Sequence, residues 1–212
     1  MQRVILAALA VPLLAVAGLI GQSFEAFAAD PVGKVSRLRG ECVVLRGTDR
    51  VNLSEGTVVE HLDELETGAD SRLEVTLLDD TKLTLGEKAK IKVDSFVFDP
   101  NASKGEAVLQ VVKGAFRFTT GKIGGMSDKN VQVKTGFATL AVRGTDFWAG
   151  PIDGSNGVLL LSGKVEVKTK RGKTLLDDPR DGTVVSSINR RPGKARVWSD
   201  QKATRALDQT SF

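Results

Sequence analysis

The chain has 212 residues, with 30 Lys and Arg against 26 Asp and Glu, which gives a net charge of +4 at neutral pH. A domain of this length buries enough surface to need no disulfide or metal staple. One Cys and one His exclude an internal disulfide and any zinc site built on several such ligands. Basic and acidic residues are mixed along the chain, which argues against DNA or RNA as a ligand.

The first 28 residues have the pattern of a secretory signal peptide. A positive start ending at Arg3 is followed by residues 4–20, which carry no charge. The segment closes on the small-x-small pattern Ala26-Phe27-Ala28, so Ala26 and Ala28 form the predicted signal-peptidase site. An uncleaved membrane anchor is the alternative, but Pro12 interrupts a run shorter than the roughly 20 residues of a spanning helix. We expect cleavage after Ala28, no stable membrane span afterwards, and a periplasmic or secreted product.

The remaining chain alternates apolar and polar residues with a period of two, and Gly, Asp and Asn interrupt the runs. This rhythm predicts many short antiparallel strands. The fold class expected is all-β, an antiparallel jelly-roll-like β-sandwich with a short C-terminal helix. We predict the β domain over residues 29–170 and a turn-rich extension over 171–212. The helix is expected to run from Ser199 or Asp200, either of which can serve as its N-cap, to about Asp208.

Few side chains offer catalytic chemistry. His61 lies among carboxylates and is typical of a solvated loop residue, and Cys42 sits in an alternating run, as a small buried residue does. The carboxylate pairs Asp63/Glu64, Asp79/Asp80 and Asp177/Asp178 fall in turn-like sequence, where Asp usually bonds its own backbone. Asp80 is expected in the left-handed conformation. We predict no catalytic residue, no metal ligand and no cofactor; a carboxylate-dependent hydrolase stays open as an alternative.

Several motifs recur in an order and spacing that resemble the FecR-domain family. They cover roughly residues 33–170 and comprise Gly68–Leu73, the aspartate turn Leu78–Thr81, Phe96–Pro100, Val112–Ile123, Val131–Thr135, Ala138–Phe147 and the strand pair in Gly157–Lys168. The most specific combination is the Val142-Arg143-Gly144-Thr145 element with the upstream Gly114-Ala115-Phe116-Arg117. Asp80 stands where the family's aspartate turn usually has Gly.

The resemblance implies a periplasmic, jelly-roll-like β domain, known best from regulators that relay an iron-siderophore signal from an outer-membrane transporter to a cytoplasmic sigma factor. Only three residues precede the apolar segment, so we expect no sigma-binding domain and no direct sigma-factor binding. The function expected is a non-catalytic interaction or signalling module whose partner is another envelope protein, docked for instance by strand addition at an open sheet edge.

Val142, Arg143, Gly144 and Thr145 are the candidate structural or partner-binding motif. A guanidinium in strand-rich sequence must reach solvent or find a fixed acceptor, and an internal ion pair or carbonyl clamp is the favoured role for Arg143, ahead of partner contact. Gly144 predicts a bulge or a close backbone approach. A carbohydrate- or cell-wall-binding β-sandwich is the alternative function, and it would require exposed Trp148 and Trp198 on a concave face.

Overall fold

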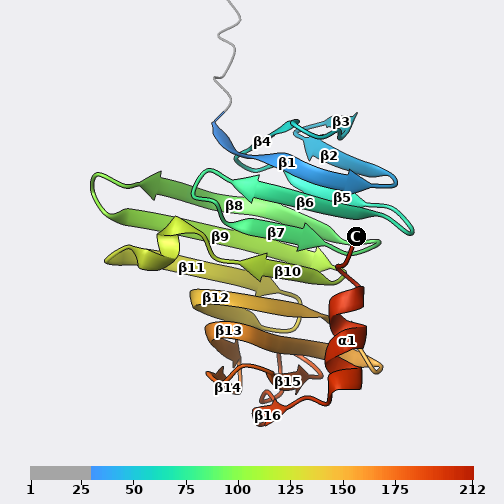
Figure 1. The fold of residues 1–212 in the computed structure, drawn as a ribbon, viewed down its shortest axis with the longest axis vertical. Coiled ribbons are helices and arrows are strands. Elements are labelled where there is room, and N and C mark those ends of the chain that lie inside the picture. The colour runs from blue at the N-terminus through green and yellow to red at the C-terminus, as the bar shows by residue number, and fades with distance from the viewer. Residues whose placement is uncertain (1–29) are drawn as a thin grey trace, which may run out of the picture.

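The computed structural model describes residues 30–212, so the predicted signal peptide and its cleavage site at Ala26 and Ala28 lie outside the described residues. Sixteen strands form one sheet, and one short α-helix follows them (Figure 1). The prediction of an all-β fold with a short C-terminal helix is therefore confirmed. Within residues 30–212, no helix has both the length and the apolarity needed to cross a membrane.

Ten strands precede the first helical turn. They are β1 (Pro31–Arg39), β2 (Cys42–Arg46), β3 (Asp49–Asn52), β4 (Val58–Glu60), β5 (Glu64–Thr67), β6 (Arg72–Leu77), β7 (Lys82–Leu85), β8 (Lys90–Asp99), β9 (Lys104–Lys113) and β10 (Phe116–Thr119). The alternation of more and less buried residues expected from the sequence is regular in β5, β6 and β10, whereas β3 is exposed throughout. A 3₁₀ turn, η1 (Lys122–Gly125), leads to β11 (Asp128–Thr135).

Two long strands, β12 (Thr139–Ile152) and β13 (Ser155–Thr169), form the hairpin on which the rest of the sheet is assembled. Three shorter strands follow: β14 (Gly172–Leu176), β15 (Asp181–Val185) and β16 (Arg196–Val197). β14 and β15 both pair with β13, so the segment predicted as a turn-rich extension continues the same sheet. Helix α1 (Asp200–Asp208) begins after Ser199, whose hydroxyl accepts a hydrogen bond from the Lys202 N–H as the predicted N-cap.

The sheet branches at β12. One edge of this strand pairs with β11 over its first residues and with β10 over Asp146–Ala149, while the other edge pairs with β13 throughout. From the branch, one layer runs β11-β9-β8-β5-β2-β3 and the other runs β10-β7-β6-β1-β4. The buried faces of both layers contribute to one continuous apolar core. The molecule is thus one continuous sheet, curled over a shared core.

The pairing of β9 with β11 is parallel, which corrects the expectation of antiparallel pairing throughout. The chain leaves β9 through the turn at Gly114, runs along β10 in the other layer, and returns through η1 to lie beside β9. Parallel neighbours need such a crossover connection. A strand of the opposite layer serves as the crossover here, so no helical pattern in the sequence announces it.

Candidate partner-binding site

The candidate motif lies at the point where the sheet branches. Val142 is buried and pairs with Val165, and the register then shifts between Arg143 and Asp146. Gly144 adopts φ +59° in this irregular segment, as the bulge predicted from the sequence requires. The bulge separates the half of β12 that pairs with β11 from the half that pairs with β10.

Thr145 is only 3% exposed, and its hydroxyl fixes the bulge. The hydroxyl donates to the Lys164 carbonyl oxygen at 2.7 Å and accepts from the N–H groups of Lys164 and Arg143, each at 3.2 Å. The Thr120 hydroxyl donates to the Thr145 carbonyl oxygen at 2.9 Å and accepts from its N–H at 3.0 Å. Thr145 therefore holds three segments of backbone together.

The Arg143 side chain is exposed, and within residues 30–212 its guanidinium forms no hydrogen bond or ion pair. The internal ion pair or carbonyl clamp favoured from the sequence is therefore wrong for this residue. Arg143 instead lines an open groove of about 540 Å³ over β11 and β12. Lys129, Asn130 and Gln132 supply the other polar side chains of the groove.

The ion pair that joins two strands at this site is made by Arg117 and Asp146. Arg117 Nε and Nη2 donate to the two carboxylate oxygens of Asp146 at 2.9 and 2.7 Å, and the Thr119 hydroxyl donates to one of them at 3.2 Å. The hydrogen bonds to Asp146 raise the pKa of the Arg117 guanidinium. Sequence reasoning missed this pair, although Arg117 ends one of the two most specific motifs and Asp146 directly follows the other. Pairing of β10 with β12 brings the two residues together.

The aspartate turn is also structural. Asp80 has φ +68°, which confirms its predicted left-handed conformation. Asp79 is fully buried, and its carboxylate accepts from the Thr81 N–H and hydroxyl and from the Ile123 N–H. Asp79 thus bonds the backbone of its own turn, as expected from the sequence. Its hydrogen bond from the Ile123 N–H also attaches η1 to this turn.

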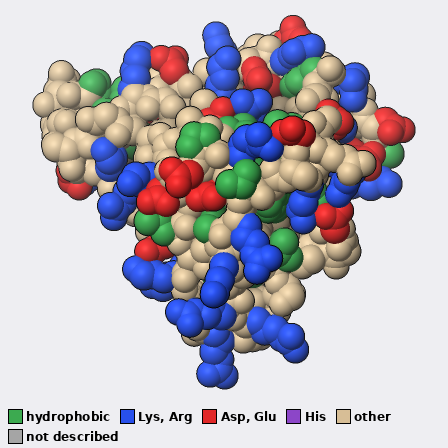
Figure 2. Space-filling model, turned by 60° about the horizontal axis from the view of Figure 1, so that its bottom comes forward, with side chains coloured by type: hydrophobic (Ala, Val, Ile, Leu, Met, Phe, Trp, Pro, Cys, Tyr) green, Lys and Arg blue, Asp and Glu red, His purple; other side chains and the backbone are tan. Residues whose placement is uncertain are grey.

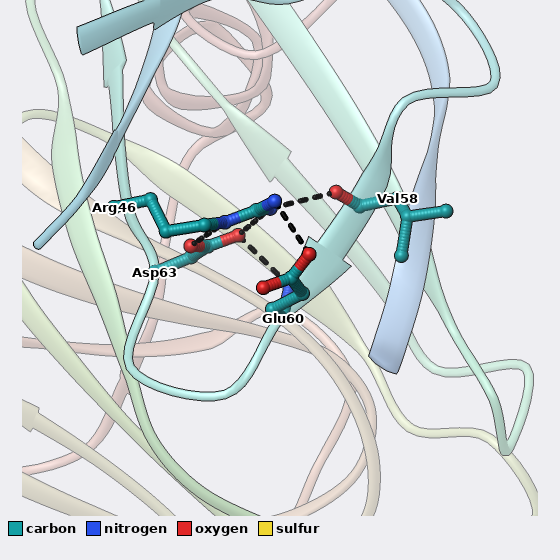
Figure 3. Close-up of polar contacts among 4 residues, drawn as sticks. All are labelled: Arg46, Val58, Glu60 and Asp63. Carbon is teal, nitrogen blue, oxygen red and sulfur yellow. Dashed lines mark hydrogen bonds and ion pairs between the residues drawn. The ribbon is translucent and has the colours of Figure 1, made fainter. Parts of the chain in front are cut away.

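A second buried carboxylate, that of Asp63, lies at the far end of the curled sheet (Figure 3). Arg46 of β2 donates through Nε and Nη2 to both oxygens of Asp63, at 2.9 and 2.7 Å, and Asp63 is fully buried. The same guanidinium donates to the Val58 carbonyl oxygen at 3.1 Å and pairs with Glu60, both in β4. Arg46 therefore links the first layer to the outermost strand of the second, and these hydrogen bonds raise its pKa.

The remaining candidates for chemistry are placed apart. The His61 ring is exposed and bonds the Asp94 carbonyl oxygen at 2.9 Å, and Cys42 is buried and free. Asp177, Asp178 and Asp181 gather at one turn, where the Asp181 carboxylate accepts from the Asp178 N–H at 3.3 Å. This arrangement is a capped turn of the kind expected for neighbouring Asp residues.

Both tryptophans are in the interior. Trp148 is 0% and Trp198 6% exposed, and their rings meet edge to face with centroids 6.3 Å apart. A carbohydrate-stacking face needs exposed aromatic rings. The carbohydrate-binding alternative required Trp148 and Trp198 to be exposed, and neither of them is.

The fold defines a curled-sheet, all-β protein with a polar groove at its branch point. Residues 63–166 match the family described as FecR protein, so this part of the chain is a FecR domain, as the motifs indicated. The matched region runs from the buried Asp63 through the Val142–Thr145 motif to Glu166, near the end of β13.

Two crystal structures of a putative anti-sigma factor from Parabacteroides distasonis ATCC 8503 are similar to this chain. They align with TM-scores of 0.53 and 0.52, each at 20% identity over 68% of this chain. The alignment covers 63% and 64% of those proteins, so this chain corresponds to less than two thirds of their length. At this identity the likeness is one of fold. No curated protein matches the sequence.

Proposed function

We propose that this protein is an exported, non-catalytic FecR-domain module that binds another cell-envelope protein through the groove beside Arg143. The observation that carries the proposal is an exposed, unpaired guanidinium held on a rigid frame. Thr145 locks the backbone that presents it, and Gly163 packs against that backbone so closely that a Cβ would lie 2.1 Å from the Gly144 carbonyl oxygen. Arginine on a pre-organised support is well suited to bidentate recognition of a partner carboxylate.

Export is supported by the pattern of residues 1–28. Fractionation of cells producing the protein, followed by measurement of its intact mass, tests this part. A periplasmic or secreted species that begins at Ala29 is expected. A full-length species retained in the membrane would instead favour the uncleaved anchor.

A signalling role is supported by the match to the FecR family and by the fold shared with the anti-sigma factor structures. Direct binding of a sigma factor forms no part of the proposal. The non-catalytic assignment is supported by the contacts of the buried carboxylates of Asp63 and Asp79. Both accept hydrogen bonds from backbone N–H groups, and Asp63 also accepts from the Arg46 guanidinium, so they stabilise the fold.

In-cell photocrosslinking tests the groove. A photoreactive residue at Gln132, which lines the groove, is compared with one at Lys34, an exposed position on β1. We expect a discrete crosslinked species from Gln132 alone, and we expect it to disappear when Arg143→Ala is added.

The melting temperature of Arg143→Ala should equal that of the parent, because the side chain has no partner to lose within residues 30–212. Identical crosslinks from both positions, or a species that survives Arg143→Ala, would count against the groove as the binding site. A large fall in melting temperature would return Arg143 to a structural role.

A further inference from the structure

The charge of this protein is concentrated at one end. Residues 167–199 contain nine basic and three acidic residues, a net charge of +6, whereas the whole chain carries +4. The remainder is therefore net negative, at −2. The two signs are mixed over most of the sequence, but this one segment is predominantly basic.

Two segments bring the basic side chains together. The β13–β14 hairpin carries Lys168, Lys170 and Arg171, and the loop before β16 carries Arg190, Arg191 and Lys194; these six residues are the basic cluster. The Lys170 N–H donates to the Ile188 carbonyl oxygen at 3.0 Å, and the Thr174 hydroxyl donates to the Gly193 carbonyl oxygen at 2.9 Å. The loop is therefore fixed against the hairpin.

A close contact shows how tightly the two segments meet. A Cβ built on Gly172, in the hairpin, would lie 2.9 Å from Arg191 Nε and 3.1 Å from its Cγ. The guanidinium stem of Arg191 thus lies directly over the hairpin turn, next to Arg171. Figure 2 turns this end toward the viewer and shows Lys and Arg side chains gathered over the lower part of the molecule.

The basic cluster has no counter-charge of its own. All six side chains are exposed, and none forms an ion pair or a side-chain hydrogen bond within the described part of the chain. Lys90, by contrast, pairs with both Glu64 and Glu66. Like charges held together without ion pairs of their own repel one another, and an anionic partner would relieve that repulsion.

The shape of this end favours a flat partner. Lys194 borders an open groove at one side of the cluster. Among the main cavities of residues 30–212, none is centred on the six residues, and the cluster has no exposed aromatic anchor of the kind found in stable protein interfaces. It also lacks exposed aromatic rings for stacking nucleic-acid bases, since the nearby Trp198 is buried. Exposed apolar residues flank it instead: Leu175 is 47% and Val184 38% exposed.

We propose that the basic cluster docks the domain onto an anionic phospholipid surface. Clusters of four to eight Lys and Arg residues bind such surfaces through the headgroup phosphates, and adjoining apolar side chains enter the interface. This inference is separate from partner binding at the Arg143 groove, which lies on β11 and β12. Docking would hold the domain at a bilayer while the groove stays free.

Vesicle flotation tests the proposal. The purified protein is mixed with vesicles of phosphatidylcholine alone or with about one third phosphatidylglycerol, at low and high salt. We expect binding only to the anionic vesicles, weakened by salt, and we expect Arg190→Glu/Arg191→Glu to reduce the partition coefficient by at least about tenfold. The control Lys34→Glu/Lys82→Glu reverses two exposed, unpaired lysines on β1 and β7.

All proteins compared carry the same N-terminus, so any contribution of residues 1–28 cancels between them. Equal losses in the cluster variant and the control, or equal binding to neutral vesicles, would overturn the proposal. Tighter binding to duplex DNA than to anionic vesicles, abolished by the same cluster variant, would assign the cluster to a phosphate polymer instead. Circular dichroism of each variant confirms that the fold is retained.

Discussion

At the residue scale, Asp63 is a buried charge whose partners are all provided by the fold. Replacing it by Ala leaves the Arg46 guanidinium and the Glu60 N–H without their acceptor. Loss of one member of a fully buried ion pair costs about 3–5 kcal/mol. We expect Asp63→Ala to lower the free energy of unfolding by about 3 kcal/mol, near the lower limit, because the Arg46 side chain is 41% exposed and water can solvate it. Urea denaturation measures the change.

Arg50 provides the matched comparison on the neighbouring strand. It pairs with Glu66 at 2.9 Å, but its side chain is 55% exposed. Arg50→Ala should cost less than about 1 kcal/mol, as exposed pairs do. If the two variants lost the same stability, burial of Asp63 would not be the cause.

Cys42 gives the fold a pH dependence in the alkaline range. Burial, reinforced by the charge of Glu41, raises the pKa of its thiol from 9.0 to about 11. The folded protein keeps this proton between those values while the unfolded chain releases it, so the free energy of unfolding falls as the pH rises from about 9 to about 11. Cys42→Ala should lack this part of the decline. Urea denaturation of both proteins across that interval measures it, and equal slopes would contradict the assignment.

At the scale of elements, Gly144 in the bulge of β12 and Gly163 in the neighbouring strand β13 form a matched pair of glycines with different surroundings. Both Gly144 and Gly163 have positive φ, but a Cβ on Gly144 meets nothing within 4 Å, whereas one on Gly163 meets the Gly144 carbonyl oxygen. Gly144→Ala should cost about 1 kcal/mol of conformational strain. Gly163→Ala adds a backbone clash and should cost about 3 kcal/mol or more. Denaturation midpoints rank the two, and the reverse order would refute a locked bulge.

These elements also show what sequence patterns can and cannot predict. Most of the strands, the left-handed Asp80 and the start of the C-terminal helix at Ser199 or Asp200 depend on neighbours within a few residues, and the sequence predicts them. The parallel pairing of β9 with β11 depends on a crossover through the opposite layer, which leaves no local trace. The partner of Arg117 lies 29 residues away and becomes visible only when β10 meets β12. For the same reason, the ion pair between strands that we expected of Arg143 is formed by Arg117 instead.

At the scale of the molecule, the C-terminal segment connects parts that lie far apart in the chain. The Gln209 side chain donates to the Pro151 carbonyl oxygen, and the Arg72 guanidinium donates to the Ser211 carbonyl oxygen, each at 3.1 Å. Arg37 also stacks on the Phe212 ring at 4.1 Å. Helix α1 lies along the ends of β12 and β13 (Figure 1). The second apolar cluster, which contains Trp148, Trp198 and Ala206, is buried beneath it.

Because both layers and the last strands share one core, we expect the described domain to unfold in a single cooperative transition. Ala206→Glu tests whether α1 belongs to that unit, since this position is fully buried against Trp148. The unpaired carboxylate should displace the helix, lower the melting temperature and increase acrylamide quenching of Trp fluorescence, while the transition stays single. Thr204→Glu, on the exposed face of the same helix, should change neither measurement. A separate early transition in Ala206→Glu would mean that the C-terminal segment folds independently of the curled sheet.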